Sequence, residues 1–162
     1  MIIIHPTAKV SSQSDIEDSI RNTKIEIGEN SVIDSFVKIK PAGGDGDVTI
    51  GKSTFINSGT VIYTGNGVKI GNHVSIAANC TFAATNHAYK DKNKLIQNQG
   101  FLPSKGGITL EDDVWVGAGS VFLDGAYVET GVVIAAGSVV KGRLKAYGVY
   151  SGENLERIRD RT

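Results

Sequence analysis

Ile-Gly-Asn-His-Val-Ser-Ile-Ala-Ala-Asn-Cys-Thr-Phe, residues 70–82, places a large apolar side chain at every sixth position. The same six-residue period extends from this stretch toward both ends of the chain. It divides the chain into six sets of three, all Ile, Val, Leu or Phe: Ile4, Val10, Ile16; Ile27, Ile33, Ile39; Ile50, Ile56, Ile62; Ile70, Ile76, Phe82; Leu110, Val116, Phe122; and Val128, Ile134, Val140.

This period fits neither an α-helix nor a protein built of hairpins. It fits a triangular coil with three short strands per turn, in which each apolar residue stacks on the one a full turn away. The period slips after Ile16, Ile39, Ile62 and Phe82, always behind the third residue of a set. We therefore expect every insertion to leave the same corner of an all-β, parallel β-helix of about six coils, spanning residues 1–150.

Two segments depart from the repeat. A polar, lysine-rich excursion loop, residues 88–109, follows Thr85-Asn86-His87, and a long loop inside a regular chain is usually functional. Beyond the coils lies a tail, residues 151–162. There the spacing of Leu155 and Ile158 favours a short C-terminal helix, with Asn154 as its cap.

Composition narrows the classes of partner and location. Seventeen basic residues balance seventeen acidic ones, which argues against binding to nucleic acid or to an anionic membrane. The single cysteine, Cys80, excludes an intramolecular disulfide framework. The apolar N-terminal residues 1–4 are too few for a signal peptide or a membrane span. We expect a cytoplasmic protein without membrane insertion.

The Ile-Gly-x-x-x-x repeats, with Asp-Val-Trp-Val-Gly at 113–117 and Ile-Ala-Ala-Gly-Ser at 134–138, resemble the hexapeptide-repeat acyltransferases, sugar O- and N-acetyltransferases among them. The resemblance implies a left-handed β-helix and a homotrimer with active sites between subunits. It implies transfer of an acetyl group from acetyl-CoA to a hydroxyl of a sugar or polysaccharide precursor, by direct attack and without a metal.

Histidine is the natural base for such a reaction, because its pKa lies near neutrality. The resemblance implies that His87, at the mouth of the loop, takes the proton of the acceptor. It also implies that Asn57, thirty residues earlier, orients the acceptor. Tyr89 is a further candidate contact with the acceptor. His5 and His73 lie in ordinary repeat positions, and we expect them to be structural.

The cofactor-binding residues implied by the resemblance are Trp115, Gly117, Ala118, Ala136, Lys141 and Arg143. Trp115 would also form a wall of the acceptor pocket. Backbone N–H groups of the turn 117–119 would face the thioester oxygen or the pantetheine arm, and the two cations would face the phosphates of coenzyme A. Each of these residues also fits a structural role in a repeat corner or a solvated edge.

Three alternatives stay open. The first is N-acetylation of an amino sugar nucleotide. The second is a zinc enzyme of the γ-carbonic anhydrase type, which needs three converging histidines; the three present are not spaced as a close pair. The third is a non-catalytic β-helix that binds a surface through threonines, which here do not recur in register. The identity of the acceptor does not follow from spacing.

Overall fold

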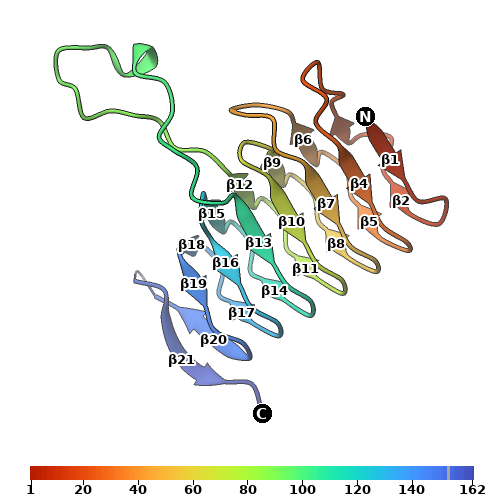
Figure 1. The fold of residues 1–162 in the computed structure, drawn as a ribbon. Coiled ribbons are helices and arrows are strands. Elements are labelled where there is room, and N and C mark those ends of the chain that lie inside the picture. Colours follow the sequence, from red (N-terminus) through yellow and green to blue (C-terminus); the bar gives the residue numbers. More distant parts are fainter. Residues whose placement is uncertain (153) are drawn as a thin grey trace.

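The computed structural model describes residues 1–152 and 154–162 and shows a triangular prism of stacked parallel strands (Figure 1). Three sheets form its faces. Sheet A contains β1 (Ile2–Ile4), β4 (Ile25–Ile27), β7 (Val48–Ile50), β10 (Val68–Ile70), β13 (Ile108–Leu110), β16 (Tyr127–Val128) and β19 (Arg143–Leu144). Sheet B contains β2 (Lys9–Val10), β5 (Val32–Ile33), β8 (Phe55–Ile56), β11 (Ser75–Ile76), β14 (Trp115–Val116), β17 (Val133–Ile134), β20 (Gly148–Ser151) and β21 (Glu156–Asp160). Sheet C contains β3 (Asp15–Ile16), β6 (Lys38–Lys40), β9 (Val61–Tyr63), β12 (Thr81–Ala83), β15 (Val121–Leu123) and β18 (Val139–Val140). The chain passes from A to B to C in each coil, which confirms the predicted parallel β-helix.

The core is a stack of apolar side chains that repeats from coil to coil. Ile56, Ile76 and Val116 lie in register in sheet B, and none is more than 1% exposed. In sheet C the rings of Phe82 and Phe122 stack with centroids 4.5 Å apart. Full burial of side chains of this size stabilises a fold by about 1.5–3 kcal/mol each.

The first coil differs from the others, because its apolar residues are not enclosed by stacking on both sides. Ile4 is 43% exposed, and Val10 and Ile16 are only partly buried. An interior side chain in this fold packs against the coil before it and the coil after it. The first coil has a neighbour on one side only, and its apolar residues stay partly accessible.

The insertions leave the prism at one corner, as predicted from the positions of the slips. Segments 17–24, 41–47, 64–67 and 84–107 each join a strand of sheet C to the next strand of sheet A, and they lie along one edge in Figure 1. The last of them projects furthest and contains the 3₁₀ turn η1 (Ile96–Asn98). A backbone bridge between His87 and Phe101 closes its base.

The tail forms a strand and not the predicted short helix. β21 pairs antiparallel with β20, Val149 lying opposite Arg159, and Asn154 lies in the turn before it. Ile158, expected in that helix, lies in the strand and is 58% exposed. The N–H and C=O groups at the edge of β20 need partners, and the tail supplies them as a strand. Within residues 1–152 and 154–162 no helix is long and apolar enough to span a membrane.

Candidate active site

The outer faces of sheets A and B differ in polarity. Sheet A presents Ile3, Glu26, Thr49, Lys69, Thr109, Tyr127 and Arg143 in one register column, whereas sheet B presents Lys9, Val32, Phe55, Ser75, Trp115, Val133 and Val149. Phe55 and Trp115 are 47% and 57% exposed. Sheet B is therefore a candidate binding face.

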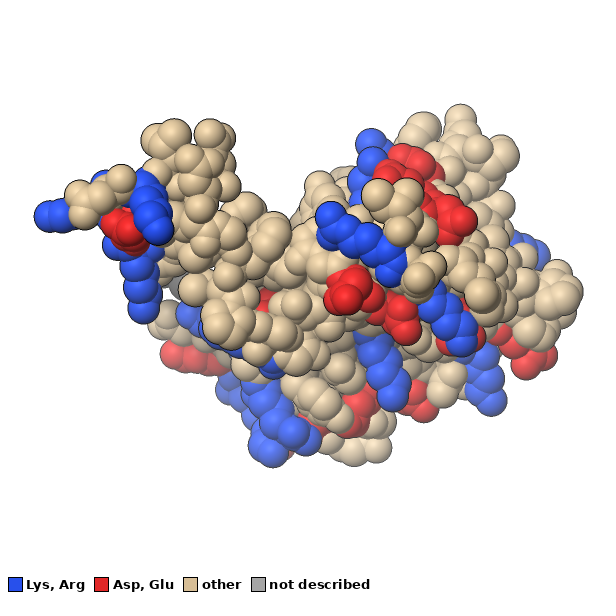
Figure 2. All heavy atoms as spheres, turned by 45° about the horizontal axis from the view of Figure 1, so that its top comes forward, with Lys and Arg blue, Asp and Glu red and all other residues tan. Residues whose placement is uncertain are grey.

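Figure 2 shows acidic and basic side chains interspersed over the visible face, with a hollow between the projecting loop and the body.

His87 stands beside a pocket at the corner from which the loop emerges. The pocket has a volume of about 290 Å³ and is lined by Ala42, Gly43, Tyr63, Ala83, Thr85, His87 and Phe101. The imidazole packs against the ring of Phe101, with centroids 4.6 Å apart. The His87 side chain is exposed and has no hydrogen-bond partner within the described part of the chain. Its ring nitrogens are thus accessible to a small molecule.

Gly43 shapes this pocket. Its φ is +81°, and a Cβ there would lie 2.6 Å from Thr85 Oγ1. Any other residue would strain the backbone and displace Thr85. No spacing in the sequence pointed to Gly43 or Tyr63, because they belong to earlier coils and meet the His87 segment only through stacking.

Three other residues expected at the acceptor lie elsewhere in the same protomer. Asn57 follows β8 at the corner between sheets B and C, where its Nδ2 donates to Ile76 O over 2.7 Å. Trp115 points outward from β14 in sheet B. Tyr89 is exposed on the loop, two residues beyond His87. A single protomer therefore does not bring these side chains into the His87 pocket.

The turn at 117–119 offers fewer free donors than expected. The N–H of Gly117 donates to Ile134 O over 2.8 Å, and that of Gly119 donates to Ala78 O over 3.0 Å. The expectation of a free N–H is wrong for these two, because the ladder between coils uses both. Within residues 1–152 and 154–162 the exposed Ala118 N–H has no acceptor, and the same holds for Ala136 one coil further on. The two residues follow neighbouring strands, β14 and β17, at equivalent positions of successive coils.

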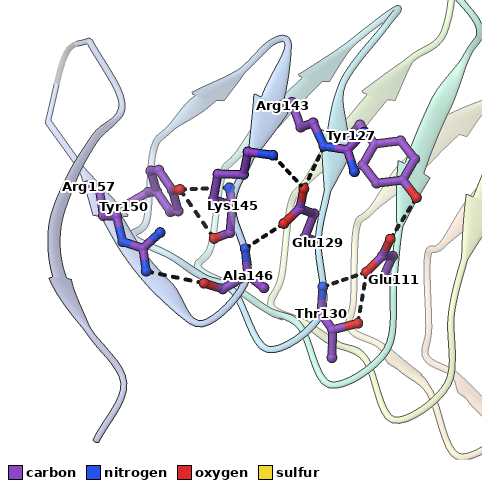
Figure 3. Close-up of polar contacts among 9 residues, drawn as sticks. All are labelled: Glu111, Tyr127, Glu129, Thr130, Arg143, Lys145, Ala146, Tyr150 and Arg157. Atoms are coloured by element: carbon purple, nitrogen blue, oxygen red, sulfur yellow. Dashed lines mark hydrogen bonds and ion pairs between the residues drawn. The ribbon is translucent and has the colours of Figure 1, made fainter.

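Arg143 is already paired, as Figure 3 shows. Its Nε donates to Glu129 over 2.5 Å, and its guanidinium lies 4.4 Å from the centre of the Tyr127 ring. Lys145 Nζ lies 3.2 Å from the same carboxylate. Lys141 is exposed and makes no ion pair with any described residue. Of the two cations expected at the phosphates, only Lys141 keeps an uncompensated charge.

The carboxylates of Glu111 and Glu129, shown in Figure 3, connect the last coils through hydrogen bonds. The hydrogen bond from Arg143, with further ones from the Ala146 N–H and Lys145, lowers the pKa of Glu129 to about 2. Glu111 accepts from Tyr127 Oη over 2.6 Å and from the N–H and hydroxyl of Thr130 over 2.8 Å each, and these bonds lower its pKa. Each carboxylate accepts from residues of the following coil, which gives this network a structural role.

Comparison with known proteins identifies the repeat. Residues 107–142 match the family model described as bacterial transferase hexapeptide (six repeats). This segment contains the fifth and sixth sets of the repeat and is similar to bacterial transferase hexapeptide repeats. A probable macrolide acetyltransferase of Lysinibacillus sphaericus is 35% identical to it over 60 residues, which cover 37% of this chain. The matched segment spans only 33% of that relative's length.

Solved structures share the fold of this chain. A mutant of AntD, an N-acyltransferase from Bacillus cereus, in complex with dTDP-4-amino-4,6-dideoxyglucose and coenzyme A, has a TM-score of 0.82 at 23% identity, covering 99% of this chain and 84% of AntD. A hexapeptide-repeat acetyltransferase from Vibrio cholerae, complexed with acetyl coenzyme A, has a TM-score of 0.73 at 27% identity, covering 83% and 69%. The fold is thus the left-handed parallel β-helix that the sequence resemblance implied.

Proposed function

We propose that this protein transfers an acetyl group from acetyl-CoA to a hydroxyl of a sugar or polysaccharide precursor, with His87 as the general base. The observation that carries the proposal is the exposed imidazole of His87, without a hydrogen-bond partner in the described chain, beside a pocket of small and aromatic residues. A positioned base of this kind contributes about 10²- to 10⁴-fold. The acetyltransferase relative and the neighbours bound to coenzyme A support acyl transfer.

The lining of the pocket favours a hydroxyl acceptor over an amine. A hydroxyl must lose its proton as it attacks, so it needs a base at the reacting atom. An amine is an ammonium ion near neutral pH, and a carboxylate is the usual group that binds it. Among the described residues no Asp or Glu lines the His87 pocket.

N-acetylation of an amino sugar nucleotide is the second candidate. It is favoured by the likeness to AntD, an N-acyltransferase whose complex contains an amino sugar nucleotide. In that reaction His87 would deprotonate the ammonium before attack. The zinc alternative gains no support, since no three His, Cys, Asp or Glu side chains of the described residues are grouped as metal ligands.

We place the pantetheine arm of acetyl-CoA along the corner between sheets B and C. Ala118 and Ala136 are exposed, and their N–H groups, which have no acceptor in the described chain, are available to donate to amide carbonyls of the arm. Gly117 keeps the backbone approachable, and Lys141 is the candidate partner for a phosphate. Arg143 contributes less there, because Glu129 already holds it.

We propose a homotrimer in which the loop of one subunit faces sheet B of the next. In one protomer His87 lies at the corner between sheets C and A, whereas Trp115 lies on the outer face of sheet B. An adjacent subunit would bring such groups together. The exposure of Leu95 and Ile96 on the loop, 65% and 58%, supports this arrangement, as does the apolar column on sheet B. Asn57, Tyr89 and Trp115 keep their proposed acceptor contacts in this assembly.

Release of thiol from acetyl-CoA tests the proposal against a panel of sugars, amino sugars and nucleotide sugars. We expect acceptor-dependent release that a chelator does not reduce. Absence of release with every acceptor would contradict acetyl transfer, and equal release by His87→Ala would contradict the assigned base.

A further inference from the structure

A trough on the outer face of sheet B ends at the C-terminal hairpin. In the strand pairing Trp115 lies beside Val133, Val133 beside Val149, and Val149 opposite Arg159 of β21. These residues, with Asp160, Arg161 and Thr162, line a cavity of about 600 Å³. The apolar column of sheet B therefore ends on a cation that the tail adds to the sheet.

Trp115 forms an accessible aromatic surface in this trough. Its side chain is 57% exposed, and its neighbours in the column, Ser75 and Val133, are small. A second hollow of about 440 Å³, lined by Ser75, Val133 and Arg161 among others, adjoins the same indole. Planar rings stack on an indole face left open in this way.

The charged groups of the trough leave one cation uncompensated. Arg157 pairs with Asp160, and Arg161 Nη1 lies 2.9 Å from the carboxylate of Asp113. Both acidic side chains beside the trough are thus already engaged. The Arg159 side chain is exposed and has no ion-pair or hydrogen-bond partner within residues 1–152 and 154–162. Arg161 donates only through Nη1 to the described residues, so its other N–H groups are available.

We propose that this trough binds a nucleoside diphosphate group, with the base stacked on Trp115 and the phosphates held by Arg159 and Arg161. Guanidinium groups suit phosphate because their planar N–H groups match its oxygens. An aromatic surface that ends on arginine fits a ligand that is planar at one end and anionic at the other. For the source of this group the assignment rests on the proposed function. The group belongs either to a nucleotide-linked sugar acceptor or to coenzyme A, in which case its diphosphate lies in the trough and Lys141 is left as a candidate for its remaining phosphate.

Fluorescence of Trp115, the only tryptophan of the chain, tests the site directly. The purified full chain is titrated with ADP and with dTDP, and inorganic pyrophosphate serves as the ligand without a base. We expect saturable quenching by a nucleotide and much less by pyrophosphate. Arg159→Ala should weaken nucleotide binding about tenfold, whereas the exposed Arg21→Ala, at the opposite end of the prism, should leave it unchanged. Quenching by neither nucleotide, or equal affinity in Arg159→Ala, would overturn the assignment.

Steady-state kinetics then separates the two sources. If the group belongs to the acyl donor, Arg159→Ala raises KM for acetyl-CoA and coenzyme A displaces ADP. If it belongs to the acceptor, the same variant raises KM for the nucleotide sugar alone. Normal acetyl transfer without nucleotide quenching would contradict the nucleotide site in the trough but not the proposed function. Quenching without any acetyl transfer would contradict the proposed function but not the nucleotide site. If Trp115→Ala and Arg159→Ala change only the sedimentation of the protein, the trough is a contact between copies and the assignment fails.

Discussion

The imidazole of His87 and the ring of Phe101 pack with their centroids 4.6 Å apart and their planes inclined by 47°. The same two residues form the backbone bridge that closes the base of the long loop, flanked by the bonds from Ala88 N to Gly100 O and from Leu102 N to Asn86 O. The anchor of the loop and the proposed base are therefore one structural unit. Displacement of the loop would move the imidazole with it.

Replacing His87 by Ala should lower kcat by about 10²- to 10⁴-fold, because a positioned base contributes that much to the rate. The affinity for acetyl-CoA should change little, since the proposed contacts at Ala118 and Ala136 lie at another corner. Steady-state kinetics and calorimetric titration measure the two quantities. His5→Ala, whose ring contacts only Thr7, is the matched control. A nearly normal kcat in His87→Ala would contradict the assignment of His87 as the base. An acetyl group captured on Cys80 by mass spectrometry would contradict direct attack of the acceptor on the thioester.

The fold was predictable because its dominant interaction repeats. Ile70, Ile76 and Phe82 each occupy an interior position that recurs every six residues, so the period alone indicates the prism. The tail was not predictable in the same way. The spacing of Leu155 and Ile158 is a local signal, whereas pairing with the edge of β20 depends on a strand that only the coil places there.

The site was predictable only in part for a similar reason. A loop motif marks His87, but Gly43 reaches the same pocket through the stacking of coils, which no local spacing reports. Likewise the sequence shows a glycine-rich turn at 117–119, while the register between coils decides which N–H stays free. Ala118 therefore remains a candidate donor, and Gly117 does not.

Ile76→Asp should unfold the domain. Ile76 is completely buried between Ile56 and Val116, and an unpaired buried charge costs at least several kcal/mol, comparable with the whole stability of a typical domain. Circular dichroism and thermal denaturation measure the effect. Ser75→Asp, one residue away on the same strand but facing outward, should remain folded. A folded Ile76→Asp protein would refute the register of the coils.

Sedimentation should give a mass three times that of the 17.1 kDa chain. If sheet B meets the loop of the next subunit, Phe55→Glu should weaken the trimer, because a charge would be placed in an apolar contact. Thr49→Glu, on the polar face of sheet A, should leave the assembly intact. A monomer that still turns over acetyl-CoA would contradict the proposed homotrimer.

Glu129→Gln should destabilise the last coils in a pH-dependent way. The folded protein lowers the pKa of Glu129 from 4.5 to about 2, so its contribution to stability is present above pH 4.5 and disappears as the pH falls toward 2. The melting temperature of the variant should lie a few degrees below that of the parent at neutral pH, since the cations that pair with Glu129 are solvent-exposed and such pairs contribute modestly. The difference should shrink on acidification. A difference that is independent of pH between 2 and 7 would show that the carboxylate charge is not responsible.

Ala118→Pro should weaken binding of coenzyme A about 3- to 10-fold, the range for loss of one hydrogen bond. Ala118 precedes Gly119, whose φ is +68°, and proline is common at the corresponding position of a type II turn. The substitution therefore removes the free N–H while keeping the backbone path. Ala118→Ser retains that N–H and should bind coenzyme A as the parent does. Calorimetry measures both affinities, and circular dichroism checks that the coil is intact. If a folded Ala118→Pro protein binds coenzyme A with unchanged affinity, the pantetheine arm does not lie along this corner.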